Sequence, residues 1–212
     1  NGQEKAINDI IIKLSLSNND NLLDIGCGPG NLLMPLSKIV NSATGIDHIN
    51  CLETLKNTHK INKNISLVPG NFLDIEINQT YEKILCYSVI QYLSDEKELF
   101  IFINKALNLL KHGGKLLIGD LPNLSRKKRF MNSDFGHNYD RKYRNNKTED
   151  ESELSNTILL EDHNLVVIDD NLILKILKKT RQNGFNSFLL DQDPDLCLGY
   201  TREDILITKF LK

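Results

Sequence analysis

Apolar and polar residues follow two rhythms along the first part of the chain, one typical of helices and one of buried strands. From Gln3 to Leu16 apolar residues recur at helical spacing, and the polar run SNND (17–20) ends the pattern. NLLDIG (21–26) is a short apolar run closed by glycine, which indicates a buried parallel strand. NLLMPLSKI (31–39) returns to helical spacing. The pattern therefore predicts a helix, a strand, a glycine-rich turn and a second helix.

The alternation of strands and helices continues to residue 120. A helix cap is predicted at Ser94 and a glycine stop at Gly113. Strands that alternate with helices at this rhythm predict a parallel sheet covered on both faces. The further predicted strands are 42–47, 65–71, 81–89 and 115–120, and the further predicted helices are 51–60 and 94–114.

The regular pattern stops after this point. Residues 121–156 are rich in Asn, Ser, Lys and Arg and have little apolar periodicity, which indicates a flexible insertion or a lid over the substrate site. A helix is predicted over 171–185, followed by a closing pair of strands at 186–191 and 204–210. We therefore expect one α/β domain over residues 1–212.

Composition excludes several classes of protein. A chain of 212 residues with 40% hydrophobic and 25% charged residues fits one globular domain. No apolar run approaches the roughly 20 residues that span a bilayer, so no membrane association is expected. The four cysteines lack zinc-site spacing, which predicts reduced thiols in a cytoplasmic protein and no metal. The net charge of -2 gives no overall attraction to nucleic acid.

Three glycines, Gly26, Gly28 and Gly30, follow the first predicted strand. In an open parallel sheet, ligands bind beyond the carboxyl ends of the strands, and glycine lets a ligand approach the backbone without meeting a Cβ. A dinucleotide fingerprint, GxGxxG, requires glycine at position 31, which is Asn31. A dehydrogenase is therefore the weaker interpretation, and a plain strand-to-helix turn is the structural alternative.

The stretch LDIGCGPG (23–30) resembles the first motif of class I S-adenosylmethionine-dependent methyltransferases. The resemblance implies a Rossmann-like three-layer sandwich with a seven-stranded, mostly parallel sheet, an antiparallel last hairpin and S-adenosyl-L-methionine as cofactor. Other stretches resemble the later motifs of this family in the expected order: GID (45–47), PGNF (69–72), YEKILCYSVIQYLSD (81–95), LLKHGGKLLIGD (109–120) and NGF (183–185).

The resemblance also implies roles for individual residues. Asp47 ends the second strand, where its carboxylate would accept both ribose hydroxyls; a helix cap is the alternative role. Asp24 would face the methionine end of the cofactor, or else stabilise the loop through backbone amides. Asn71 stands where the family commonly has an Asp that binds adenine. The predicted cofactor-binding residues are Asp24, Gly26, Cys27, Gly28, Asp47, His48, Asn71, Phe72 and Ser88.

Methyl transfer from a sulfonium is an in-line displacement, so alignment in a dry site is the main requirement. A hydroxyl acceptor must also lose its proton, and His, Asp and Glu are the usual bases. We rank His137 first, followed by Asp120 and Tyr92. A solvated loop histidine is the alternative for His137. Gln91 occupies a position where many members of the family carry a histidine, and it cannot act as a base.

Two basic clusters in the predicted insertion, RKKRF (126–130) and RKYR (141–144), favour an anionic small-molecule acceptor; a charged solubilising loop is the alternative. We predict methyl transfer to an oxygen of a small polar molecule. An RNA or protein methyltransferase and a non-catalytic cofactor-binding subunit are the alternatives, and no oligomeric state is predicted. The predicted substrate-binding residues are Arg126, Arg129, Arg141 and Arg144.

Overall fold

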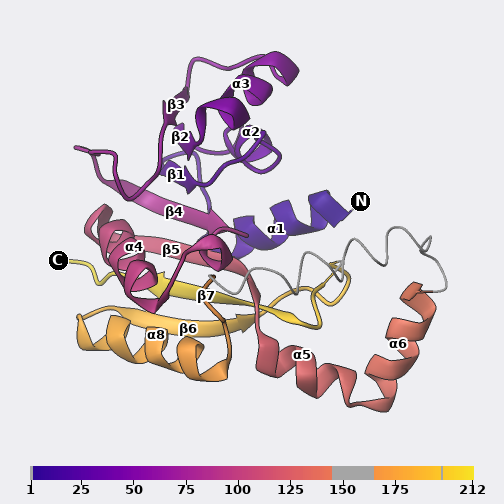
Figure 1. The fold of residues 1–212 in the computed structure, drawn as a ribbon. Coiled ribbons are helices and arrows are strands. Elements are labelled where there is room, and N and C mark those ends of the chain that lie inside the picture. Colours follow the sequence, from indigo (N-terminus) through magenta and orange to yellow (C-terminus); the bar gives the residue numbers. More distant parts are fainter. Residues whose placement is uncertain (1, 145–164, 197) are drawn as a thin grey trace.

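The computed structural model describes residues 2–144, 165–196 and 198–212 (Figure 1). The strands are β1 (Asn21–Ile25), β2 (Ser42–Asp47), β3 (Ile65–Pro69), β4 (Tyr81–Tyr87), β5 (Leu110–Pro122), β6 (Asn186–Asp191) and β7 (Arg202–Thr208). The helices are α1 (Gly2–Leu14), α2 (Leu33–Leu36), α3 (Ile49–Thr58), α4 (Glu96–Asn108), α5 (Leu124–Met131), α6 (Asp134–Arg144) and α8 (Asp170–Gln182), with a 3-10 turn η1 (Ile90–Tyr92).

The seven strands form one sheet in the order β3-β2-β1-β4-β5-β7-β6. The first five strands run parallel to one another, and β7 pairs antiparallel with both β5 and β6. The predicted Rossmann-like sheet with an antiparallel closing pair is therefore confirmed. The strand order reverses between β1 and β4, and ligands of open parallel sheets bind at such a reversal.

The sheet is the middle of three layers. Alternate residues of a central strand face opposite layers: in β5, Leu116 and Ile118 contact the core under α4 and α8, whereas Leu117 contacts the core under α1, α2 and α3. Figure 1 shows α8 running along β6. Strands buried on both faces read as continuous apolar runs, which is why the sequence revealed them.

The predicted bounds of α4 are wrong at both ends. Its cap is Asp95, whose side chain accepts a hydrogen bond from the backbone N–H of Glu98 at 2.8 Å. Ser94 contributes from one position earlier, because its N–H and hydroxyl both donate to the Glu98 carboxylate. The helix ends at Asn108 rather than near Gly113, because Leu110 already pairs with Tyr81 of β4. Strand pairing overrides the helical pattern there.

Part of the predicted insertion is helical, and its role as a flexible insertion or a lid stays a prediction. Residues 124–144 form α5 and α6, which extend beyond the end of the sheet (Figure 1), whereas residues 145–156 lie outside the described residues. The rings of Phe130, Phe135 and Tyr139 contact one another and the ring of Tyr200, with centroids 5.2–6.2 Å apart. This contact with a distant residue orders the two helices, and local periodicity did not predict it.

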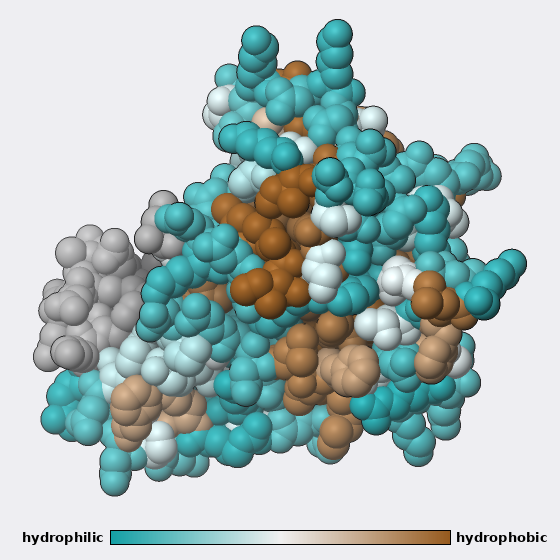
Figure 2. Space-filling view, turned by 180° about the vertical axis from the view of Figure 1, so that it is seen from behind, coloured by the Kyte–Doolittle hydropathy of each residue, from teal (hydrophilic) through white to brown (hydrophobic). Residues whose placement is uncertain are grey.

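Hydrophobic side chains gather in patches on the surface of the molecule (Figure 2). Figure 2 shows brown patches on the back face, separated by hydrophilic side chains. Within residues 2–144, 165–196 and 198–212, no helix is long and apolar enough to cross a membrane.

Candidate functional site

A cavity of about 380 Å³ lies at the carboxyl ends of β1, β2, β3 and β4. Its wall includes hydrophobic side chains from η1 and α4 as well as polar groups from the strand ends. The catalytic candidate Tyr92 lines it. Six of the nine predicted cofactor-binding residues also line it: Gly26, Asp47, His48, Asn71, Phe72 and Ser88. The structure therefore brings together predicted site residues that are up to 66 positions apart in the sequence, from Gly26 to Tyr92.

The glycine turn is bound to the end of β2 through its backbone. The N–H groups of Gly26 and Cys27 both donate to the carbonyl oxygen of Ile46, at 2.8 and 3.1 Å. Gly26 has a φ of +77°, and a Cβ at this position would lie 2.3 Å from Cγ2 of Val89. Both the backbone conformation and the close approach require glycine there.

The carboxylate of Asp47 joins β2 to the same turn. Its Oδ2 accepts a hydrogen bond from the N–H of Gly28 at 2.7 Å, and its Oδ1 accepts one from the N–H of His48 at 2.6 Å. The thiol of Cys51 also donates to this carboxylate, which raises the pKa of Cys51. Asp47 is not the cap of α3, because His48 accepts the capping hydrogen bond from Asn50.

Asp24 carries a buried carboxylate beside this site. The residue is 2% exposed, and its Oδ2 has no hydrogen-bond partner among the described residues. Burial, followed by the negative charge of Asp47, raises the pKa of Asp24 to about 7. An unpartnered buried carboxylate oxygen is unfavourable unless a ligand supplies a donor, so this position suits a cationic or hydrogen-bond-donating group.

The side chain of Cys27 does not face the cavity. It is 6% exposed and packs in the core with residues of α2 and α3, and burial raises the pKa of its thiol. Cys27 and Gly28 therefore contribute to the glycine turn through their backbone. The other free cysteines of the described residues are Cys51 and Cys86.

Phe72 and Asn71 form the wall that follows β3. Phe72 is 4% exposed and meets the ring of Phe102 edge-on, with centroids 4.9 Å apart. The ammonium group of Lys105 lies 5.2 Å from the Phe72 ring, and this holds the aromatic wall in place. The amide oxygen of Asn71 accepts a hydrogen bond from the N–H of Leu73 at 3.0 Å. An amide oxygen has two lone pairs, and this bond uses one of them.

Of the three catalytic candidates, Tyr92 lines the cavity and Asp120 and His137 do not. Tyr92 lines it and is 70% exposed. Asp120 does not line it but is hydrogen-bonded to the hydroxyl of Ser88, which does. His137 is exposed on α6 and does not line the cavity, so the structure does not bring the first-ranked base to the site.

The predicted anion-binding arginines do not line the cavity either. Arg126 is paired with Asp191 at 2.6 Å and with Glu203 at 3.0 Å, and Arg129 is paired with Asp170. Both arginines are thus paired with carboxylates, and their role in substrate binding stays a prediction. Arg141 is exposed on α6. Arg144 is the last residue of α6, and its side chain lies outside the part of the chain that the structure describes.

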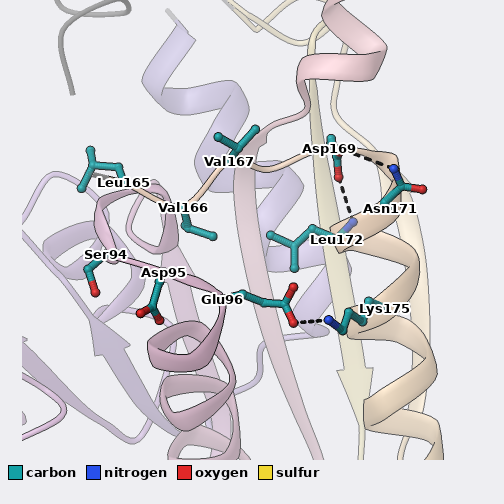
Figure 3. Close-up of a pocket in the computed structure, with 10 residues that line it drawn as sticks. All are labelled: Ser94, Asp95, Glu96, Leu165, Val166, Val167, Asp169, Asn171, Leu172 and Lys175. Carbon is teal, nitrogen blue, oxygen red and sulfur yellow. Dashed lines mark hydrogen bonds and ion pairs between the residues drawn. The ribbon is translucent and has the colours of Figure 1, made fainter. Parts of the chain in front are cut away.

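A second cavity, of about 440 Å³, lies between the starts of α4 and α8 (Figure 3). Asp95 and Asp169 cap the two helices, and Glu96 of α4 is paired with Lys175 of α8. The N–H of Val166 donates to the carbonyl oxygen of Leu93 at 2.8 Å, which closes one side. The sequence did not predict this cavity, because α4 and α8 are far apart along the chain. Its charged groups are satisfied by their neighbours.

The comparison with protein families decides between the interpretations of this site. A family model described as "Methyltransferase domain" matches residues 16–183. The chain belongs to this methyltransferase family. With the confirmed fold, this match also confirms the resemblance to class I S-adenosylmethionine-dependent methyltransferases that the motifs indicated.

Two curated relatives of this methyltransferase domain match about half of the chain. An uncharacterized methyltransferase from Bacillus mycoides (strain KBAB4) is 30% identical over 100 residues, which cover 47% of this chain and 46% of that protein. The ubiquinone biosynthesis O-methyltransferase of Rickettsia akari (strain Hartford) is 29% identical over 93 residues, covering 43% of this chain and 35% of that protein. The chain thus spans less than half the length of these curated relatives.

A solved structure supports the fold of the methyltransferase domain over nearly its full length. The N-methyltransferase NodS from Bradyrhizobium japonicum WM9 has a TM-score of 0.66 at 14% identity, covering 99% of this chain and 97% of that chain. A second structure of NodS is a complex with S-adenosyl-L-homocysteine.

Within the described part of the present chain, no group of three or more His, Cys, Asp or Glu residues is arranged to hold a metal ion.

Proposed function

We propose that this domain binds S-adenosyl-L-methionine in the 380 Å³ cavity and transfers its methyl group to a small polar acceptor. The observation that carries the proposal is the buried oxygen of Asp24, which has no partner among the described residues and lies beside a glycine turn that is hydrogen-bonded to Asp47. A cofactor with an ammonium group, a sugar and a base has complementary groups for this arrangement. When bound, it would supply a methyl group already activated on sulfur.

Each part of the cavity has a proposed task. Asp24 would balance the positive charge at the methionine end, since an ionised carboxylate favours a nearby cation. Asp47 would accept hydrogen bonds from the ribose hydroxyls while its bond to Gly28 keeps the turn in place. Phe72 would pack against the base, and the free lone pair of Asn71 would accept from its amino group.

We further propose that the acceptor is a small molecule methylated on oxygen. The name of the Rickettsia akari relative, an O-methyltransferase of ubiquinone biosynthesis, supports this choice. Tyr92, at the exposed side of the cavity, is suited to orient such an acceptor through its hydroxyl. Since Arg126 and Arg129 are already paired with carboxylates, nothing in their contacts supports a negatively charged acceptor.

A cytoplasmic location is also part of the proposal. The thiols of Cys27, Cys51 and Cys86 are free, and unpaired thiols are typical of reducing compartments.

Calorimetric titration with S-adenosyl-L-homocysteine tests the cofactor proposal. We expect the wild-type protein to bind and Asp47→Asn to bind roughly 10- to 100-fold more weakly, because hydrogen bonds to a charged group contribute about 1.5–3 kcal/mol each. Glu53→Gln is the matched control, since it removes one exposed carboxylate of the adjoining α3. A folded wild-type protein that does not bind this compound would refute the proposal, and binding of a nicotinamide dinucleotide in its place would favour a dehydrogenase.

A further inference from the structure

Two non-glycine residues beside the cavity have left-handed backbone conformations. Ser88, directly after β4, and Asp120, within β5, both have a φ of +59°. Such conformations are unfavourable for residues with a Cβ, and they persist where the surroundings impose them, commonly at functional sites. The third described case, Ser15, lies just after α1 and away from the cavity. The contacts of Asp120 and Ser88 show what imposes their conformation.

Asp120 lies in a β-bulge between β5 and β7. Ile118 is opposite Ile205 and Leu121 is opposite Glu203, so Gly119 and Asp120 together face the single residue Asp204. A bulge of this kind bends its strand and redirects a side chain, and bulges are enriched beside active sites. Here it accompanies the left-handed turn that places the Asp120 carboxylate at Ser88.

Two residues of β7 clamp Asp120 in this conformation. Asp204 accepts the N–H of Asp120 at 2.9 Å, and Arg202 donates from Nη1 to the carbonyl oxygen of Asp120 at 3.0 Å. Asp204 is completely buried and is itself held by the ammonium group of Lys13 at 2.8 Å and by the amide of Gln192 at 3.0 Å. The clamp is therefore anchored both in the sheet and in α1.

The contacts then lead from Asp120 to the glycine turn. The hydroxyl of Ser88 donates to Oδ2 of Asp120, and the N–H of Ser88 donates to the carbonyl oxygen of Gly119 at 3.0 Å. The following residue, Val89, fills the space where a side chain on Gly26 would be. Ser88, Val89 and Gly26 all line the cavity, so the position of residue 88 sets part of its shape.

We propose that Asp120 is a positioning residue for the cofactor cavity: its bond to Ser88 holds the end of β4 in the left-handed conformation that places Val89 against the glycine turn. Arg202 and Asp204 of β7 hold the backbone of Asp120 through hydrogen bonds. This inference rests on the proposed function, because its readout is binding of S-adenosyl-L-homocysteine. In this role Asp120 shapes the cofactor cavity. The role requires neither proton transfer nor contact with the acceptor.

A mutant cycle tests this role. Asp120→Gly removes the carboxylate, and with it both the bond to Ser88 and the ion pair with Arg202 at 3.8 Å, but allows residue 120 to keep its positive φ. The comparison with the Ser88→Gly background isolates the bond to Ser88. We expect this change to weaken binding of S-adenosyl-L-homocysteine roughly 5- to 30-fold in the wild-type background. In the Ser88→Gly background, residue 88 adopts the left-handed conformation without support. There the same change should alter the dissociation constant less than about twofold, whatever Ser88→Gly does alone.

A conservative variant separates the hydrogen bond to Ser88 from the negative charge of Asp120. Asp120→Asn keeps an oxygen acceptor for the Ser88 hydroxyl but has no carboxylate, so it should recover most of the affinity that Asp120→Gly loses. Circular dichroism confirms that each variant is folded, and Asp120→Asn provides the test if Asp120→Gly does not fold. In that case, an Asp120→Asn affinity more than about fivefold below wild type would overturn the inference.

The outcomes distinguish this inference from the proposed function. If the wild-type protein binds the ligand but Asp120→Gly has no effect, or has the same effect in both backgrounds, the positioning role is wrong and the cofactor proposal stands. If the folded wild-type protein does not bind at all, the proposed function fails and this inference fails with it.

Discussion

Asp24 shows how a single buried group makes the properties of this domain depend on pH. Burial, with the charge of Asp47 as the second cause, raises its pKa from 3.8 to about 7. The folded protein therefore retains a proton between about pH 4 and pH 7 that the unfolded chain has already lost. The stabilisation from this group is fully present below about pH 4 and is lost as the pH rises through 7.

The first prediction concerns stability. Asp24→Asn removes the titrating group, so the free energy of unfolding of the variant minus that of the wild type should rise by about 1–4 kcal/mol between pH 4.5 and pH 8. Urea denaturation at several pH values measures this difference. Glu53→Gln, which changes an exposed carboxylate, should show no comparable rise. A flat difference for Asp24→Asn would contradict the raised pKa.

The second prediction concerns binding. An ammonium group favours the ionised form of Asp24, so the affinity for S-adenosyl-L-homocysteine should increase from pH 6 to pH 8. Near pH 7 binding should release a fraction of a proton, which calorimetry in buffers of different ionisation enthalpy detects. The Asp24→Asn variant should lack this component. Net proton uptake by the wild-type protein would argue against a cation at Asp24.

At the scale of the element, the turn after β1 combines a backbone requirement with a packing requirement. Gly26→Ala places a methyl group in the left-handed region and against Val89, so we expect a loss of about 2–4 kcal/mol in stability together with weaker cofactor binding. Gly184→Ala is the matched control: its φ is +85°, but a Cβ there would meet nothing within 4 Å. Its cost should be about 1 kcal/mol, with unchanged binding.

Denaturant unfolding and calorimetry on both glycine variants separate the two requirements. Equal losses in stability for Gly26→Ala and Gly184→Ala would show that contact with Val89 is unimportant.

Helix α5 is held to the sheet by Arg126. Its guanidinium donates to Asp191, Glu203 and the carbonyl oxygen of Tyr200, and Glu203 is 5% exposed. Arg126→Ala leaves Glu203 without its cation, so we expect a loss of about 1–3 kcal/mol in stability, or roughly 2–4 °C in Tm for each kcal/mol. Thermal unfolding measures the effect. The exposed Lys128→Ala serves as control, and equal melting temperatures would contradict a structural role for Arg126.

The whole molecule shows why some features were predictable and others were not. The strands and the glycine turn depend on local patterns, and the residues from Gly26 to Ser88 that line the cavity follow the carboxyl ends of those strands. The pairing of Arg126 and the clamp on Asp120 depend on the register between β5 and β7. Residues about 80 positions apart meet there, and no periodicity within either segment reveals the bulge that joins them.

The position of His137 illustrates the same limit. Its place in the sequence, after β5, suggested a lid over the methyl group, but α6 is held by rings that include Tyr200. A histidine in a polar segment gives no indication of which way its helix will run. Gln91, in contrast, has a buried amide oxygen without a partner among the described residues, although an amide cannot act as a base.

The place of β7 has a consequence for synthesis on the ribosome. β7 follows both β5 and β6 along the chain but lies between them in the sheet. A nascent chain that has emerged only as far as Tyr200 lacks Arg202 and Asp204, and the bulge around Asp120 has nothing to form against. We therefore expect arrested translation intermediates of that length to lack a finished ligand pocket, so that competence arises abruptly when the last strand inserts.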